Sequence, residues 1–134
     1  PLRRALQLVP EHAEASLMLA QALLEQRKFT QAIGVLEAGV ARHPNERGLH
    51  HQLAIARGAL GEWQAALTAR QTALRLAGDR ASWQQWLHLA QIQQRLGDDA
   101  AAQEALARAR SLAPAAEQGH LVLDHALVSV PGSP

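Results

Sequence analysis

Hydrophobic residues recur along residues 13–46 at the three- and four-residue spacing that places side chains on one face of an α-helix. A first stripe comprises Leu17, Ala20, Leu23 and Leu24, and a second comprises Phe29, Ala32, Ile33, Leu36 and Val40. The polar pair Arg27-Lys28 separates the two stripes, and Pro44 ends the second because proline lacks an amide proton. The pattern predicts two antiparallel helices, each of which needs another element to bury its apolar face.

The same pattern returns in residues 47–80 and 83–116. The pair Leu19-Ala20 recurs as Leu53-Ala54 and then as Leu89-Ala90, at intervals of 34 and 36 residues. Two sets of small residues keep these intervals in the second helices: Ala32, Ala66 and Ala102, and Gly39, Ala73 and Ala109. Small side chains let crossing helices approach closely. The sequence therefore predicts three repeats of one helix hairpin, with the two extra residues in the loop at 78–82.

Both ends of the chain carry additional helical patterns. Residues 1–10 end in a proline and share one apolar face, so we interpret them as the second helix of a truncated repeat. Residues 115–130 predict one further helix, which we interpret as a cap on the last apolar face of the array. Two alternatives stay open for this segment: it could begin a truncated fourth repeat, or it could fold into a groove of the array.

Composition supports an all-α fold. The chain has 134 residues, of which 48% are hydrophobic, yet it contains one Phe, three Trp and no Tyr. Ala and Leu favour helices, whereas sheets favour β-branched and aromatic residues. The length is that of a single domain, so we expect residues 1–134 to form one helical-repeat domain.

The repeats carry a recognisable motif. The third has Trp86, Leu89-Ala90, Ala102, Leu106 and Pro114 at the spacing of the pattern W-x2-L-G-x2-Y, A-x3-F, P. The second departs most, with His50, Arg57, Arg70 and Gly78 at the Trp, Tyr, Phe and Pro positions. Residues 1–114 thus resemble the tetratricopeptide repeat family. The resemblance implies a right-handed superhelical array of antiparallel helix hairpins, with about 3.5 repeats plus a C-terminal helix.

The resemblance also implies a function in protein–protein interaction. In this family the first helices of successive repeats line a concave groove that binds a peptide or protein segment. Carried onto this chain, the groove residues are Leu17, Gln21, Leu24, His51, Ile55, Leu87, Gln91, Gln94 and Arg95. One branch of the family holds a peptide carboxylate with Lys and Asn at such places, but here the single Lys is Lys28 and the single Asn is Asn45. We therefore expect a protein or peptide partner with apolar anchors, bound without a carboxylate clamp.

An architectural role is the alternative. The stripe of Leu2, Leu6 and Val9 lacks its partner helix, so it could contact an upstream part of a larger multidomain protein or a second copy of the chain. The sequence predicts a possible homodimer through this half-repeat. It also indicates a piece of a longer protein, because half a repeat is missing.

No motif for chemistry accompanies the repeats. The formal charge is +1 without a run of Lys or Arg, so we expect no nucleic-acid partner, and Cys is absent. Of the seven His residues, only His120 pairs with a carboxylate, Asp124, at metal-ligand spacing, and the pair is better explained as two polar residues on the surface of a helix. We expect no enzyme activity, cofactor or metal. No apolar run is long enough to insert into a membrane. The sequence leaves the compartment open, favouring the cytoplasm, and its Arg-rich, Ala-rich composition suggests a bacterial source.

Overall fold

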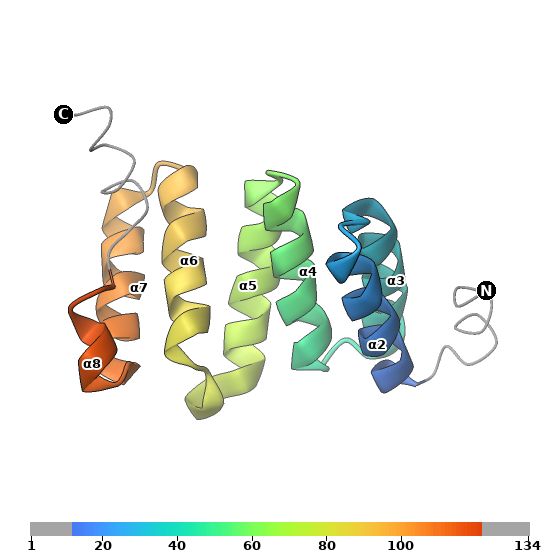
Figure 1. Ribbon diagram of the computed structural model, residues 1–134, viewed down its shortest axis with the longest axis horizontal. Helices are drawn as coiled ribbons and strands as arrows, with labels where there is room; N and C mark the ends of the chain where they lie inside the picture. Colours follow the sequence, from blue (N-terminus) through green and yellow to red (C-terminus); the bar gives the residue numbers. More distant parts are fainter. Residues whose placement is uncertain (1–11, 122–134) are drawn as a thin grey trace. The chain divides into compact units, whose positions relative to one another are not determined.

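The computed structural model describes residues 12–121, which belong to two compact units, Pro1–Ala77 and Gly78–Pro134. In the N-terminal unit the described residues form α2 (Ala13–Glu25), α3 (Phe29–Arg42), α4 (Arg47–Ala59) and α5 (Trp63–Ala77) (Figure 1). In the C-terminal unit they form the 3-10 turn η1 (Gly78–Arg80), α6 (Trp83–Arg95), α7 (Asp99–Leu112) and α8 (Ala115–Gln118). Every regular element between residues 12 and 121 is helical, which confirms the all-α prediction.

The helices pair as the repeats predict. Hairpins α2–α3, α4–α5 and α6–α7 fall within residues 13–46, 47–80 and 83–116, and α3 ends at Arg42, two residues before Pro44. The two extra residues of the second interval fall in the predicted loop at 78–82, which contains η1. Residues 1–10, predicted as half a repeat, lie outside the described residues, and the single-domain interpretation stays a prediction.

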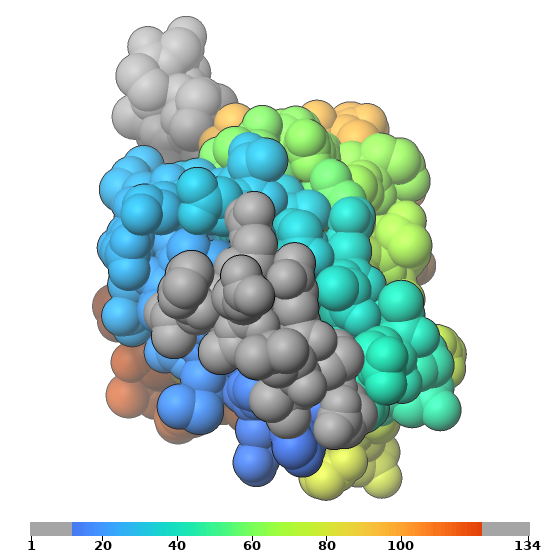
Figure 2. All heavy atoms as spheres, turned by 90° about the vertical axis from the view of Figure 1, so that its right-hand side faces the viewer, coloured from blue at the N-terminus to red at the C-terminus, as the bar shows by residue number. Residues whose placement is uncertain are grey.

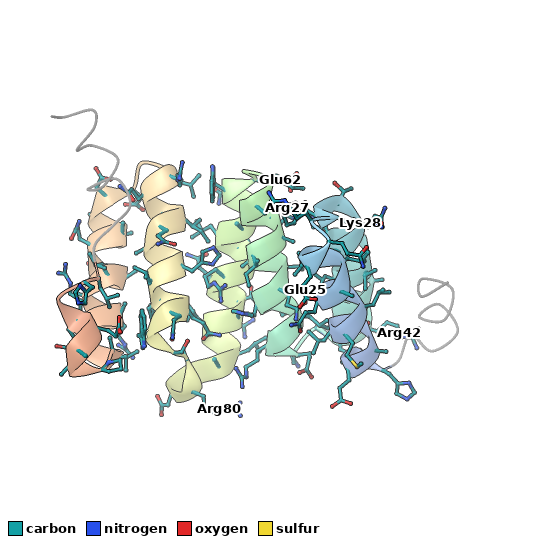
Figure 3. The ribbon with its side chains drawn as sticks, viewed as in Figure 1. Glu25, Arg27, Lys28, Arg42, Glu62 and Arg80 are labelled. Carbon is teal, nitrogen blue, oxygen red and sulfur yellow. The ribbon has the colours of Figure 1, made fainter. Side chains whose placement is uncertain are left out.

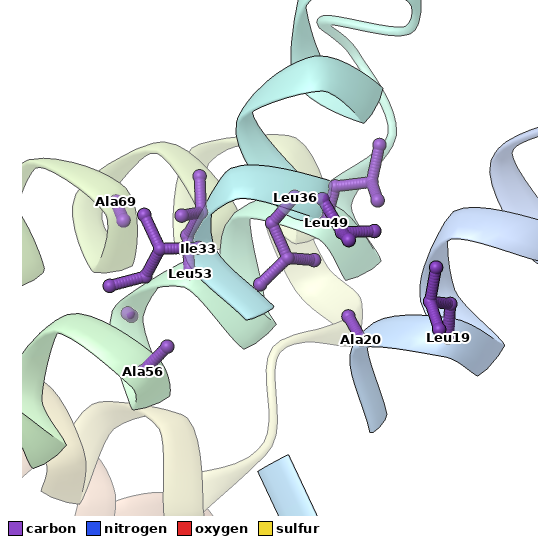
Figure 4. Packing of buried hydrophobic residues seen from close by; sticks show 10 residues of the cluster. Leu19, Ala20, Ile33, Leu36, Leu49, Leu53, Ala56 and Ala69 are labelled. Carbon is purple, nitrogen blue, oxygen red and sulfur yellow. The ribbon is translucent and has the colours of Figure 1, made fainter. Parts of the chain in front are cut away.

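The core of the N-terminal unit forms where α3 packs against both α2 and α4. Leu36 of α3 and Leu49 of α4 are fully buried there, and Ile33 and Leu53 join the same cluster (Figure 4). Helices α2 (blue) and α3 (cyan) also lie side by side in the space-filling view (Figure 2). The first hairpin therefore buries its apolar stripe partly against itself and partly against α4.

Small residues mark the closest crossing, as the sequence predicts. A Cβ atom added to Gly39 of α3 would lie 3.2 Å from Leu49 Cδ2 and 3.2 Å from Ser16 Cβ. Gly39 thus lies between α2 of its own hairpin and α4 of the next. The equivalent Ala73 and Ala109 are also buried.

The inner turn of each hairpin contains one residue in the left-handed conformation. Gly61 has φ 76° and Gly97 has φ 84°, and the equivalent residue of the first hairpin is Arg27, with φ 61°. Figure 3 shows Arg27 and Lys28 at the turn after α2, at the same end of the N-terminal unit as Glu62. The guanidinium of Arg27 lies 5.4 Å from the centroid of the Phe29 ring, which is a cation–π contact across this turn.

Polar side chains begin the helices of the C-terminal unit. The Ser82 hydroxyl accepts a hydrogen bond from the Gln85 amide, and the Gln85 side chain accepts one from the Ser82 amide, a complete capping box at α6. The Asp98 carboxylate accepts from the Ala101 amide at the start of α7. Both interactions satisfy amides that have no partner within the helix.

The continuous helix predicted for residues 115–130 is wrong in its described part. Helix α8 ends at Gln118, and Gly119 and His120 form a turn. The reason is a competing contact: Arg110 of α7 donates from Nε (3.0 Å) and Nη2 (2.7 Å) to the carbonyl of Leu121, whose side chain is buried. This carbonyl is therefore held against α7. Residues 122–130 of the predicted helix lie outside the described residues.

Candidate partner-binding surface

Five of the predicted groove residues lie in the N-terminal unit, on the two first helices α2 and α4, which contact each other. Leu17 of α2 packs towards α4, because a Cβ at Gly48 would lie 3.3 Å from its Cδ1. Leu24 is partly buried against the core cluster. Gln21 is exposed, and Ile55 of α4 is 40% exposed. On this part of the predicted site, partly buried Leu17 and Leu24 therefore lie beside the exposed side chains of Gln21 and Ile55.

His51 of α4 is the fifth of these residues, and a buried arginine holds it. The Arg70 guanidinium donates Nη1–H to His51 Nδ1 at 2.8 Å. Because a guanidinium can only donate, Nδ1 must be the unprotonated nitrogen and Nε2 carries the proton. Burial, together with the nearby charges of Arg70 and Arg47, lowers the pKa of His51 to about 4. His51 is therefore neutral at pH 7 and adds no charge to the surface.

Arg70 of α5 is the largest fully buried side chain in residues 12–121, with a relative exposure of 1%. Burial lowers its pKa to about 10, so it remains charged at neutral pH. A buried charge has to be hydrogen-bonded, and the neutral imidazole of His51 is one acceptor for it. The pair joins the two helices of the second hairpin.

A second arginine connects three segments of the N-terminal unit. Arg57 of α4 donates from Nη1 to the Glu62 carboxylate at 2.7 Å and from Nη2 to the Glu37 carboxylate of α3. The hydrogen bond that Arg57 donates to Glu62 is the main cause of the raised pKa of Arg57, to which Glu37 also contributes. Because these groups are partly exposed, the network stabilises the unit only modestly.

The other four predicted groove residues lie on α6 in the C-terminal unit. Leu87, Gln91 and Gln94 are partly buried, and Arg95 is exposed. The Nε2 atom of Gln94 is buried and has no hydrogen-bond partner among the described residues. These residues recur at helical spacing and share one side of α6. The two sets belong to different units, and the continuous groove that would combine them remains a proposal.

No three His, Cys, Asp or Glu side chains within residues 12–121 could together hold a metal ion. His120 is exposed, and its predicted neighbour Asp124 lies outside the described residues. None of the described helices has the length and apolar character needed to cross a membrane.

In the sequence, Arg70 stands out only as a departure from the repeat motif. Its signal was the arginine at a position where the pattern has Phe, four residues after Ala66. A charged residue at a core position requires a partner, so a search for an acceptor on α4 could have led to His51. A cavity between α6 and α7, lined by Trp86, Leu89 and Gln93 among others, was not predicted from the sequence.

The helix hairpins, their close crossing at small residues and their left-handed turns define a helical-repeat protein of the tetratricopeptide class. Two sequence profiles described as tetratricopeptide repeat match the chain, one at residues 2–57 and one at residues 86–116. Together they cover more than half of the sequence, and the first includes most of the segment interpreted as a truncated repeat. The chain belongs to the tetratricopeptide repeat family. No curated protein matches it in sequence.

Solved structures share the fold. MamA from Desulfovibrio magneticus RS-1 (residues 41 to the end) is 27% identical, with a TM-score of 0.72 over 83% of this chain and 62% of that one. Another MamA structure has a TM-score of 0.77 at 23% identity, covering 84% of this chain and 65% of that one. YrrB, described as a TPR protein with an unusual peptide-binding site, has a TM-score of 0.73 at 15% identity, covering 83% of this chain and 56% of that one.

These neighbours confirm the predicted fold class, an α-solenoid of the tetratricopeptide kind. The chain spans less than two thirds of the length of each of them.

Proposed function

We propose that the chain is a protein-interaction module that binds a peptide or protein segment on the face formed by its first helices. The observation that carries the proposal is the surface of α2 and α4, where Leu17 and Leu24 form a partly buried apolar base beside exposed Gln21 and Ile55. Such a surface suits a segment that inserts apolar side chains and offers its backbone to amide groups. Membership of the tetratricopeptide family supports the same function.

The chemistry of this face argues against recognition of a free carboxylate. Lys28 lies in the turn between α2 and α3, and Asn45 lies in the loop before α4, so neither belongs to the first-helix face. His51, which does belong to it, is neutral because burial and the nearby charges of Arg70 and Arg47 lower its pKa. We propose that the partner is selected by apolar side chains and hydrogen bonds, without a charge clamp and without chemistry performed on it.

A pair of matched double variants tests this placement. Gln21→Asp/Gln91→Asp puts two carboxylates on the first helices, whereas Gln31→Asp/Gln103→Asp makes the same change on the second helices α3 and α7. We expect the first variant to recover at least about tenfold less partner than the parent in an affinity capture from native lysate, and the control to recover the parental amount. Equal capture by both variants would show that the first-helix face is not the binding site. Thermal unfolding of both variants checks that each one is folded.

A further inference from the structure

The outer face of α2 is apolar and open to solvent. We define this face by Ala15, Met18 and Ala22, which lie on one side of the helix because they are three and seven residues apart. The Met18 side chain is 73% exposed, and Ala15 and Ala22 are only partly buried. Covering this face with another apolar element would therefore remove hydrophobic surface from water and stabilise the N-terminal unit.

The equivalent face of α4 shows which element covers such a surface. It consists of Leu49, Gln52 and Ala56, each 34 residues further along the chain, and Leu49 and Ala56 are fully buried. Helix α3 packs against α4, with Leu36 beside Leu49 in the core cluster (Figure 4). The outer face of α4 is thus covered by the second helix that precedes it in the chain.

Residues 2–9 carry the apolar positions that α3 uses for this packing. Within α3, the positions that are buried or packed against the core cluster include Leu36, Gly39 and Val40. The residues 34 positions earlier are Leu2, Ala5 and Leu6. The middle position has to be small, because a Cβ atom at Gly39 would already lie 3.2 Å from the Leu49 side chain. Ala5 would meet Ala15 instead of a leucine, so its methyl group has room.

The polar positions of the same segment also match. The exposed residues that neighbour the packed positions in α3 are Glu37, Ala38 and Ala41. The residues 34 positions earlier are Arg3, Arg4 and Gln7. Docked in the register of α3, the segment would therefore bury its leucines and leave its charged and amide side chains in water, which is the pattern of an amphipathic helix.

The connection to α2 has the length that this register needs. Helix α3 ends at Arg42 and α4 begins at Arg47, and Pro44 is the second residue between them. In the earlier segment, Pro10 takes the same place within residues 9–12, and α2 begins at Ala13. Residues 9–12 equal residues 43–46 in number, so the segment can reach the outer face of α2 as α3 reaches that of α4.

We propose that residues 2–9 dock as a helix on the outer face of α2 of the same chain, in the register in which α3 docks on α4. A second copy of the chain carries the same residues, but its segment competes only at the concentration of the protein. The connection through residues 9–12 gives the chain's own segment an effective concentration on the order of millimolar. The chain's own segment is therefore the favoured occupant.

This contact is separate from the proposed partner surface. On α2 the partner surface is formed by Leu17, Gln21 and Leu24, and the outer face lies about a third of a turn away from it around the helix. Docking of residues 2–9 therefore leaves the partner surface uncovered, and neither proposal depends on the other. The contact does bury the leucine stripe of the segment, which would then be lost to self-association.

Pairs of introduced cysteines test the docked register, because the chain has no cysteine of its own. Ala5→Cys/Ala15→Cys places two thiols at the crossing that corresponds to Gly39 and Leu49. A disulfide needs Cβ atoms about 3.5–4.5 Å apart, which this register brings within reach. The control Arg4→Cys/Ala15→Cys has almost the same separation in sequence, but its first thiol takes the position of an exposed α3 residue.

We expect oxidised glutathione to close a disulfide within one chain at least about tenfold faster in the first variant than in the control. Mass spectrometry follows the bond, and electrophoresis without reductant separates links within a chain from links between chains. Equal rates would overturn the proposal, since a segment that does not dock would bring either introduced thiol to α2 equally often. Links formed only between chains would also overturn it, because a second copy would then occupy the face.

Thermal unfolding tests the docking without cysteines. Leu2→Ala/Leu6→Ala removes two side chains that docking buries, whereas Arg3→Ala/Arg4→Ala changes two that docking leaves in water. We expect the first variant to unfold at least about 4 °C below the parent and the second to unfold within about 1 °C of it. If the leucine variant unfolds at the temperature of the parent, residues 2–9 do not cover α2 and the proposal is wrong.

Discussion

Arg70 illustrates how one residue changes the interior of a repeat. The motif has Phe at this position, but the structure buries a guanidinium there and pairs it with the neutral ring of His51. A buried charge loses its hydration, and a hydrogen bond to a neutral acceptor compensates only part of that loss. The position should therefore be more stable with an apolar residue of similar size than with the native arginine.

The variant Arg70→Phe tests this reasoning. We expect its free energy of unfolding, measured in urea, to be at least that of the parent and at most about 3 kcal/mol higher, because apolar packing replaces a desolvated charge. Arg70→Ala should instead lose about 2–4 kcal/mol, because it leaves a cavity. In Arg70→Phe the pKa of His51, followed by nuclear magnetic resonance, should rise above its value of about 4. A large loss of stability in Arg70→Phe would show that the arginine is structurally required.

The lowered pKa of His51 also predicts a pH dependence of stability. Between pH 6.5 and about 4 the unfolded chain protonates this histidine and the folded chain does not, so stability should fall as the pH decreases through that range. Above pH 6.5 both states are neutral at this residue and the effect vanishes. Allowing for the exposed part of the ring, we expect a loss of roughly 1–2 kcal/mol.

Comparison with His51→Gln isolates this effect from the other groups that titrate at acidic pH. Urea unfolding gives the free energy of unfolding of both proteins at a series of pH values between 4 and 7. The pH-dependent loss of stability from His51 should appear in the parent and be absent from His51→Gln, so the difference between the two free energies should change as the pH falls. A difference that is independent of pH would mean that the folded state protonates His51 as readily as the unfolded state.

At the scale of the helices, the two glycines of α3 occupy opposite environments. Gly34 is exposed, and a Cβ there would meet nothing within 4 Å, whereas a Cβ at Gly39 would lie 3.2 Å from Leu49 and Ser16. The first glycine only weakens the helix, and the second allows α3 to approach α2 and α4 closely.

Substitution of the two glycines should therefore have opposite results. Gly34→Ala should raise the free energy of unfolding by about 0.5–1 kcal/mol through better helix propensity. Gly39→Val should lower it by about 1–3 kcal/mol, because the added methyl groups force the hairpins apart. Chemical denaturation measures both, and Gly34→Val serves as the control for the weaker helix propensity of valine. If Gly39→Val is no less stable than Gly34→Val, the close crossing is not a constraint.

The helices were largely predictable from the sequence because apolar periodicity, Pro44, Gly61 and the Ser82 cap are local signals that the structure keeps. Two features were not predictable because they depend on contacts between elements. The end of α8 depends on Arg110 of α7, which captures the carbonyl of Leu121. The burial of Arg70 depends on the acceptor that α4 offers. The same holds for the candidate site. The sequence indicated the face of the first helices, but it could not show that His51 is neutral, because this depends on burial and on contacts with other helices.

At the scale of the whole molecule, the alternative function is self-association through residues 1–10. The stripe of Leu2, Leu6 and Val9 is a sequence feature outside the described residues, so its role stays a prediction. If the chain dimerises through this stripe, its apparent mass should rise with concentration in size-exclusion chromatography. Leu6→Glu should then give a monomer at all concentrations, because a charge in an apolar interface is unfavourable. The control Arg4→Glu keeps the stripe intact, and an unchanged dimer in Leu6→Glu would exclude this interface.

The contact between Arg110 and Leu121 has a consequence for shortened forms of the protein. Nε and Nη2 of Arg110 already converge on the backbone carbonyl of Leu121. In a chain ending at Leu121, that carbonyl would become a terminal carboxylate facing a guanidinium, which is a stronger, charge-assisted pairing. A chain ending at Gln118 would lose both the pairing and the buried leucine side chain. Truncation after Leu121 should therefore keep the contact with Arg110, and truncation after Gln118 should abolish it.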